Sequence, residues 1–409
     1  MLKSLLSIAI ANLMKDRTSS TVNIAVITCF ITFALVMMLN ILYESSYDRY
    51  HKKADNIYRI VSNVNDGESQ YLWNVSQASL GPELLRRYPE VRNAVRFFPV
   101  GVANFSAGGK EFTEDGFYRT DPAIFSVFSF ELIAGNPKTV LSRPNTIVLT
   151  EKLARKYFGT AAKAMYQRIT SDKGELFEVT GVMKNVPANS HLIFDALISA
   201  VGTKGMDGGW ANFSTYTYIE LPDNYNERRM YVHLKSLEEE KLSDIASELD
   251  VTVSYQLQKL TNIHQACQIS DANGSSARSF VLLSLSAGII FFLGFVWILR
   301  HNRKKVTSLS TADQFIKVAG MKRRTLIVHL IAESVCLTTI AFFLGLGLVY
   351  VILPAFNQLL NKEIPFSMLW DSTVAMMMLI IFLFSGFICA IYPAFFLPRH
   401  TGLRLSRPL

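Results

Sequence analysis

Four long runs of apolar residues stand out along this chain against a central stretch of mixed polar and apolar positions. The runs cover residues 21–43, 280–299, 326–353 and 372–397. Each run is long enough to cross about 30 Å of hydrocarbon as a helix. Because the runs are nearly free of charged residues, the pattern predicts four transmembrane helices, at residues 19–43, 279–299, 326–353 and 372–397.

The central stretch, residues 44–278, has the alternation of a folded domain. Segments rich in β-branched and aromatic residues predict strands at 57–64, 146–149, 177–182 and 216–221. Thr150 can cap a helix over 151–158 that Gly159 ends, and a second, strongly charged helix is expected over 237–249. We therefore expect an α+β domain with two lobes, inserted between transmembrane helices 1 and 2.

The positions of lysine and arginine predict how the chain is oriented. Basic residues precede the first run, cluster between the second and third runs, and follow the fourth, whereas the loop at 354–371 carries only Lys362. Cytoplasmic flanks carry the positive excess, so both termini are expected in the cytosol and residues 44–278 and 354–371 outside. The remaining segments are a cytosolic amphipathic helix at 1–18, a cytosolic segment at 300–325 and a cytosolic tail at 398–409.

Composition agrees with a membrane protein, since half of the residues are hydrophobic and 18% are charged. The net charge of +8 would suit nucleic acid, but much of the basic excess lies beside the apolar runs, so topology explains the charge and no nucleic-acid partner is expected. Of four cysteines, Cys267 alone lies in the central stretch, which leaves no intrachain disulfide there.

Motifs for catalysis or metal binding are missing from the sequence. It has no GxxxxGK[ST] loop for ATP, no GxSxG elbow, and no HExxH or paired CxxC. His51, His191 and His264 are far apart along the chain, and we interpret them as surface or hydrogen-bonded residues. The chain is therefore not expected to be an enzyme, and no catalytic residue, cofactor or metal site is predicted.

Polar residues inside the apolar runs are few. The third run carries His329 and Glu333, which are four residues apart and share one helix face. Both lie in the cytosolic third of the run, which argues against a proton relay across the bilayer. Glu333 either forms a salt bridge that follows movement of the basic cytosolic loop or simply reaches the interface. Small residues that permit close helix packing are Gly345, Gly347, Ser385 and Gly386.

A series of motifs runs through the chain in order. The central stretch opens with YDRYHKKADNIYR at 47–59, and its most specific pieces are VTGV at 179–182 and VPANSHL at 186–192. Further motif segments lie at 121–122, 125–130, 134–137, 148–151, 156–159, 260–264, 333–334, 353–357 and 392–394. Together they resemble the FtsX/MacB-like permease family of ABC transporters, over almost the whole chain.

This resemblance implies a function and partners. Such permeases work in the bacterial cytoplasmic (inner) membrane with a separate cytosolic ABC ATPase, as dimers, and in the best understood members ATP-driven closure of the ATPases moves the outer domains, a mode called mechanotransmission. The expected cargo is a peptide, a lipoprotein or a hydrophobic drug, and a periplasmic adaptor is a further candidate partner. The alternative is a regulatory or sensing membrane protein that controls a cell-wall hydrolase or binds an extracytoplasmic ligand.

The cytosolic segment resembles both ends of the family's coupling segment, at 309–312 and 318–324. Only residues 313–317 lie between them, so roughly two helical turns of the family pattern are absent. The expected ATPase-coupling residues are Phe315, Lys317, Val318, Ala319, Gly320, Lys322, Arg323 and Arg324; a plain basic interface loop is the alternative. Because the chain carries a single four-helix unit, it is expected to form a homodimer or to pair with a related permease.

Overall fold

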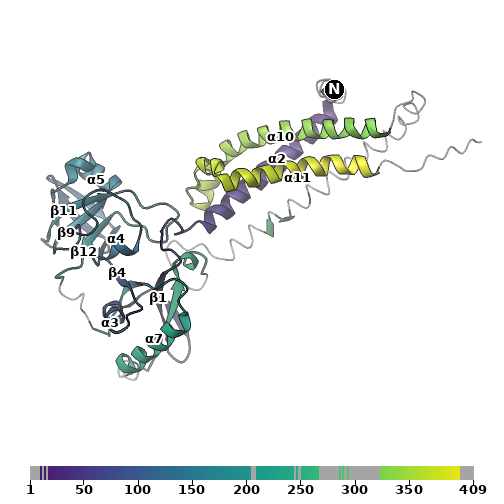
Figure 1. Ribbon diagram of the computed structural model, residues 1–409. Coiled ribbons are helices and arrows are strands. Elements are labelled where there is room, and N and C mark those ends of the chain that lie inside the picture. Colours follow the sequence, from purple (N-terminus) through teal and green to yellow (C-terminus); the bar gives the residue numbers. More distant parts are fainter. Residues whose placement is uncertain are drawn as a thin grey trace, which may run out of the picture. The chain divides into compact units, whose positions relative to one another are not determined.

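The protein divides into two compact units, Met1–Tyr43 with Ser279–Leu409, and Glu44–Arg278. We call the first the helical unit and the second the sheet domain (Figure 1). The computed structural model describes residues 10–11, 13–14, 17–203, 209–243, 246, 250–266, 285–286, 288–289, 293 and 323–396. Most of the predicted amphipathic helix, most of the second apolar run, nearly all of the coupling segment and the C-terminal tail lie outside these residues.

The described part of the helical unit consists of helices α2 (Arg17–Ser45), α10 (Arg323–Leu360) and α11 (Ser372–Phe396), with a short 3₁₀ helix, η2 (Phe366–Trp370). Within these residues, Ser20–Ser45 and Ile331–Leu360 are long and apolar enough to cross a membrane, and Ser372–Phe387 is a shorter apolar stretch. Helix α10 continues through Pro354, beyond the end expected at residue 353. A proline removes one backbone hydrogen bond, which a long apolar helix tolerates.

The three helices run beside one another in Figure 1, and their contacts involve small and polar residues. A Cβ atom at Gly345 of α10 would lie 3.1 Å from Ile31 Cγ2 of α2, so glycine permits this close approach. Thr32 Oγ1 donates to the Gly345 carbonyl over 3.4 Å, and Lys362 Nζ donates to Asn40 Oδ1 over 2.7 Å. Gly347, also expected to permit packing, faces nothing within 4 Å among the described residues.

The sheet domain is built on one mixed sheet. Its strands are β1 (Ile57–Asn65), β2 (Gln70–Trp73), β3 (Ser76–Gln77), β4 (Asn93–Pro99), β5 (Ala103–Ala107), β6 (Lys110–Glu114), β7 (Phe117–Thr120), β8 (Leu132–Ala134), β9 (Thr146–Thr150), β10 (Arg168–Ser171), β11 (Leu176–Met183), β12 (Ala196–Ser199), β13 (Phe213–Glu220) and β14 (Thr252–Lys259). The main path runs β14-β1-β13-β4-β7-β12-β9-β11-β10-β5-β6. Strands β12 and β7, and β11 and β9, pair in parallel; the other pairs are antiparallel.

Short helices cover this sheet. They are α3 (Leu80–Arg87), α4 (Ile124–Val127), α5 (Glu151–Phe158), α6 (Ala161–Ala164), α7 (Glu227–Lys241) and the 3₁₀ helix η1 (Leu260–Asn262). Helix α5 packs on β9 and β11, and α7 packs on β14 (Figure 1). The four predicted strands are confirmed to within a few residues at their ends, and the sequence is correct in predicting an α+β fold for this stretch.

Two predicted helices have different outcomes. The helix over 151–158 is confirmed, since the Leu153 amide donates to Thr150 Oγ1 over 3.3 Å and Gly159, at φ 82°, ends it. The helix expected over 237–249 begins ten residues too late, because α7 starts at Glu227. Asn226 caps α7 through the Arg228 amide over 3.1 Å, and the buried face of the helix begins at Met230.

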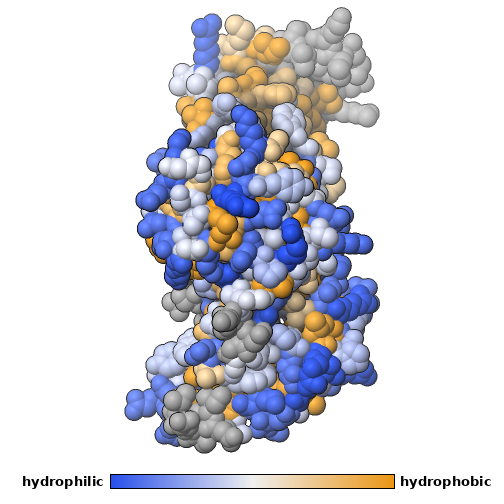
Figure 2. All heavy atoms as spheres, turned by 90° about the vertical axis from the view of Figure 1, so that its left-hand side faces the viewer, coloured by the Kyte–Doolittle hydropathy of each residue, from blue (hydrophilic) through white to orange (hydrophobic). Residues whose placement is uncertain are grey.

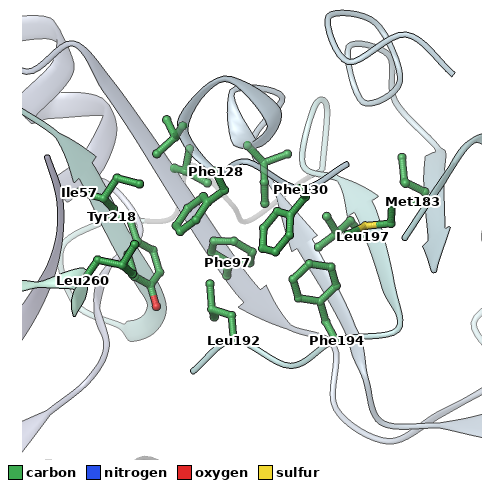
Figure 3. Packing of buried hydrophobic residues seen from close by; sticks show 14 of the residues in the cluster. Ile57, Phe97, Phe128, Phe130, Met183, Leu192, Phe194, Leu197, Tyr218 and Leu260 are labelled. Carbon is green, nitrogen blue, oxygen red and sulfur yellow. The ribbon is translucent and has the colours of Figure 1, made fainter. Parts of the chain in front are cut away.

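Among the described residues, the interior of the sheet domain contains three groups of buried apolar residues. The central group, shown in Figure 3, gathers Phe97 of β4, Phe128 and Phe130 of the segment after α4, Leu197 of β12 and Tyr218 of β13. Ile57, Leu192 and Leu260, from three distant parts of the sequence, belong to the same group. The other two groups lie under α5 and α6, and under α3 and α7.

Candidate functional site

The residues expected to couple to an ATPase are mostly beyond what the structure describes. Phe315, Lys317, Val318, Ala319, Gly320 and Lys322 lie outside the described residues, and Arg323 and Arg324 are the first residues of α10. His329 and Glu333 follow in the same helix, where Glu333 is buried. Their expected roles therefore stay predictions.

One densely bonded polar region of the sheet domain is its first segment, residues 44–56. We call this segment, together with the residues at 126–130, 186–192 and 260–264 that contact it, the junction. Four of the motif segments identified in the sequence, at 47–59, 125–130, 186–192 and 260–264, meet here, although up to about 200 residues separate them along the chain. The sequence alone did not explain why these motifs occur. In the structure, the later motifs contact the segment at 44–56, where the chain enters the sheet domain.

Asp48 is the centre of the junction. Its side chain is fully buried, and Oδ1 accepts from Ser190 Oγ over 3.2 Å and from the His191 amide over 3.1 Å. The Asp48 amide donates to the Asn189 carbonyl over 3.0 Å, and the Asn189 side-chain amide donates to the Ser46 carbonyl over 3.2 Å. The segment before Asp48 and the segment at 189–191 are thus bonded reciprocally.

Backbone conformation also marks Asp48, which has a φ of 59°. Aspartate and asparagine tolerate this left-handed region better than most other non-glycine residues. The turn brings the side chain back over the loop at 189–191. A carboxylate with no countercharge is unfavourable in a buried site, and here it accepts hydrogen bonds while His191 Nδ1 lies 2.9 Å from Oδ1, outside hydrogen-bonding geometry.

Tyr50 and His51 extend the network to two further segments. Tyr50 Oη donates to Ser190 Oγ over 3.0 Å, and burial raises the pKa of this phenol. The Ser129 amide donates to His51 Nδ1 over 3.0 Å, and the imidazole packs edge-on against Phe128 and Phe130, each with ring centroids 5.1 Å apart. Lys52 adds a second hydrogen bond to the same serine, because its backbone amide donates to Ser129 Oγ over 2.9 Å.

The protonation state of His51 follows from these contacts. Burial lowers the pKa of His51 from 6.5 to about 4; Asp48 opposes this shift and His191 adds to it. The hydrogen bond from the Ser129 amide has the same consequence, because a nitrogen that accepts from N–H must be unprotonated. His51 is therefore neutral at physiological pH, with its proton on Nε2.

The three histidines expected to be unrelated surface or hydrogen-bonded residues are hydrogen-bonded, but they are buried and all lie in the junction. His191 Nε2 lies 2.7 Å from Tyr218 Oη, and His264 is a neighbour of Tyr47. The residues that the structure describes include no group of three or more histidine, cysteine or acidic side chains that could hold a metal ion. The junction is therefore a structural network of hydrogen bonds among buried and half-buried side chains.

A second feature of the sheet domain is a pocket of about 200 Å³ between β4, β5, β7 and β11. Its floor contains Phe105, Phe177 and Ile198, and Arg119 lies in its wall, bonded to Glu175 over 2.7 Å. Figure 2 shows that the side of the domain turned to the viewer is mainly hydrophilic, with hydrophobic residues scattered among the polar ones. The pocket is small, and its arginine already has a carboxylate partner.

A mixed α/β domain that follows one apolar helix and precedes further apolar helices defines a membrane protein with an inserted domain. Residues 18–248 match the family of the MacB-like periplasmic core domain, and residues 278–399 match the FtsX-like permease C-terminal family. The chain belongs to the FtsX/MacB-like family of ABC transporter permeases, and this family membership is what the motif resemblance predicted. A cytosolic ATPase partner is implied by the family.

Two solved structures resemble part of the chain. One is a domain of a proposed permease protein from Porphyromonas gingivalis, 20% identical, with a TM-score of 0.47, covering 51% of this chain and 91% of that one. The other is the periplasmic region of MacB from Actinobacillus actinomycetemcomitans, 17% identical, with a TM-score of 0.36 and the same coverage. No curated protein matches the sequence.

Proposed function

We propose that this chain is the permease subunit of an ATP-driven transporter, in which a separate cytosolic ATPase moves the sheet domain on the other side of the membrane. Four helices anchor the domain formed by residues 44–278, and both termini lie in the cytosol of a bacterial cell with the helices in its inner membrane. The chain acts as a dimer, with itself or with a related permease. The cargo is a peptide, a lipoprotein or a hydrophobic drug that is exported or released.

The observation that carries this proposal is the way the chain enters the sheet domain. Helix α2 includes Glu44 and Ser45, the first two residues of that domain, and the bonded segment of the junction follows at once. A flexible linker would absorb movement of the helix. Here Asp48 and His51, which follow the helix closely, are buried and hydrogen-bonded to the loop at 189–191 and to Ser129, and this attachment would carry a displacement of the helix into the domain.

The absence of an ATP-binding motif from the sequence supports a division of labour between two proteins. Charged side chains are few in the described apolar helices: Ser20–Ser45 carries Glu44 at its very end, Ile331–Leu360 carries Glu333 near its beginning, and Ser372–Phe387 carries none, so these helices present no series of charges that could form a path across the bilayer. Mechanical transmission needs no such path, only stiff helices and a firmly attached load.

ATP turnover in a reconstituted complex tests the proposal. The full chain is placed in lipid nanodiscs with the ATPase that co-purifies with it, and Phe315→Asp and Val318→Asp are compared with the unaltered chain. Because a charge on an apolar docking face opposes association, both variants are expected to lower ATP turnover by tenfold or more, on the order of 1.4 kcal/mol or more of lost interaction. Val102→Asp, at an exposed position of the sheet domain, is the matched control and leaves turnover unchanged. Failure of any ATPase to bind, or equal turnover in all variants, refutes the proposal.

The pocket beside Arg119 gives the sensing alternative a specific location. A sensing protein would bind its ligand in the sheet domain without need of an ATPase, and the apolar side chains Phe105, Phe177 and Ile198 that line the pocket would suit a small apolar group of the ligand. Retained signalling in cells that lack the ATPase would favour this alternative over transport.

A further inference from the structure

One buried pair joins the beginning of the sheet domain to its end. Glu44 is the first residue of the domain, and His264 follows η1 near the end of the described part. The two are 220 residues apart in sequence, yet His264 Nε2 lies 2.9 Å from Glu44 Oε2. A carboxylate only accepts hydrogen bonds, so the imidazole N–H is the donor.

The pair is well enclosed. The side chains of Glu44 and His264 are 2% and 3% exposed, and the Tyr47 ring stacks on the imidazole with centroids 3.3 Å apart and planes at 4°. Burying a carboxylate is unfavourable unless it is paired and hydrogen-bonded, so the location of this pair calls for an explanation. An apolar contact would have stabilised the fold equally well.

The location suggests what the pair does. The chain comes from α2 into the domain at Glu44, and His264 comes before the second apolar run of the sequence, which begins at residue 280. On its other side, the outgoing segment is anchored by Leu260 and Ile263, which belong to the central apolar group shown in Figure 3. Before it, β14 pairs with β1 over residues 252–259. His264 therefore lies in the segment that leads from β14 and η1 toward the second apolar run.

We propose that Glu44, Tyr47 and His264 form a clasp that makes the two connections of the sheet domain to the membrane helices move as one. The proposal rests on the proposed function and adds the residues that deliver the movement. Without the clasp, a pull through the outgoing segment would peel η1 away from the domain. With the clasp, the pull arrives at the end of α2, where the junction holds the domain.

A directional polar pair suits this task better than an apolar contact. An apolar contact can slide while keeping most of its buried area, whereas a hydrogen bond between a carboxylate and an imidazole holds only within a narrow range of distance and angle. The stacked Tyr47 ring further limits rotation of the imidazole. The clasp thus fixes the relative position of both connections, as well as adding to stability.

The first arm of the test needs no ATPase. Amide hydrogen exchange is measured on the full chain in nanodiscs for Glu44→Ala, His264→Ala and the exchanged pair Glu44→His with His264→Glu. The two single variants are expected to speed exchange at residues 260–266 by at least about tenfold, while β9 and β11 stay protected, which shows that the domain is folded. The control is Glu90→Ala, which breaks a second His–Glu pair among the described residues of the domain, Glu90 with His233 at 3.0 Å. Unchanged exchange at residues 260–266 in both single variants overturns the clasp.

The second arm adds the ATPase and separates the clasp from the proposed function. ATP turnover and the ATP-dependent change in amide exchange of β5 and β6 are measured together. The single variants are expected to keep turnover within about twofold while losing at least about two-thirds of the ATP-dependent change, and the exchanged pair restores it in part. A purely structural pair would leave the ratio of ATP turnover to the ATP-dependent change in amide exchange the same as in the unaltered chain.

If the unaltered chain shows an ATP-dependent change and the single variants show the same change, the clasp fails and the proposed function stands. If the unaltered chain shows none, the proposed function fails, and the first arm alone decides whether the pair joins the two segments.

Discussion

Acid should loosen the junction through one residue, His51. Burial holds the pKa of His51 at about 4, against an ordinary value of 6.5. Because the pKa is lower in the folded state, the neutral form is favoured there, and the contribution to stability is complete above pH 6.5. It is lost progressively as the pH falls from 6.5 toward 4, since the unfolded state binds the proton first.

The size of the effect follows from the two pKa values. Between about pH 7.5 and about pH 5 the difference in proton binding corresponds to about 2 kcal/mol, and well below pH 4 it approaches about 3 kcal/mol. The structural event is loss of the bond from the Ser129 amide, because a protonated Nδ1 cannot accept it. Amide exchange at Ser129 in the full chain, corrected for the intrinsic effect of pH on exchange, reports this opening directly.

The matched variant is His51→Asn. The asparagine carbonyl can accept from the Ser129 amide and does not titrate, so the variant should retain protection at about pH 5 where the unaltered chain loses it. His233→Asn, at a histidine outside the junction, is the control and should leave the acid response intact. The reasoning is refuted if His51→Asn opens in acid as readily as the unaltered chain does.

Three other substitutions probe single contacts. Gly345→Leu places side-chain atoms where a Cβ already lies 3.1 Å from Ile31 Cγ2, and should destabilise the helical unit by roughly 1–3 kcal/mol in thermal unfolding in detergent, whereas Gly347→Leu, with nothing within 4 Å among the described residues, should be tolerated. Thr150→Ala removes the cap of α5 and should cost about 1 kcal/mol, seen as faster amide exchange in the first turn of that helix. Asp48→Ala should destabilise the sheet domain by about 3 kcal/mol, because it leaves two buried donors without their acceptor, whereas Asp48→Asn keeps the acceptor and the left-handed turn and should cost much less in the same unfolding assay.

Local features of this fold could be predicted from the sequence. The strand at Ile57–Asn65 and the helix at Glu151–Phe158 are specified by neighbouring residues, through β-branched composition in one and a threonine cap and glycine stop in the other. Helix α7 was misplaced because its charged surface hides the buried positions Met230 and Leu234, which lie before the segment that looked helical.

The junction could not be predicted because its contacts are remote in sequence. Asp48 meets Ser190 and His191 across more than 140 residues, and neither hydropathy nor spacing connects them. Family motifs identified both segments but not their relation. The sequence did contain a usable signal, namely an aspartate in one motif, Asp48, and a second polar motif at 186–192. Only the folded chain shows that these two motifs form one hydrogen-bond network.

The position on the sheet at which the junction packs is an argument for mechanical transmission rather than ligand binding. Leu192 and Leu260 of the junction, with Ile57 of β1 directly after it, pack into the central apolar group, which also draws residues from β4, β9, β12 and β13 near the middle of the strand order. A load attached at an edge strand such as β6 would strain the few hydrogen bonds that hold that strand. A load attached at the middle is shared by strands on both sides, whose backbone hydrogen bonds resist shear cooperatively. A binding domain has no need of a buried polar network where the chain enters, but a domain that is moved as a rigid body does.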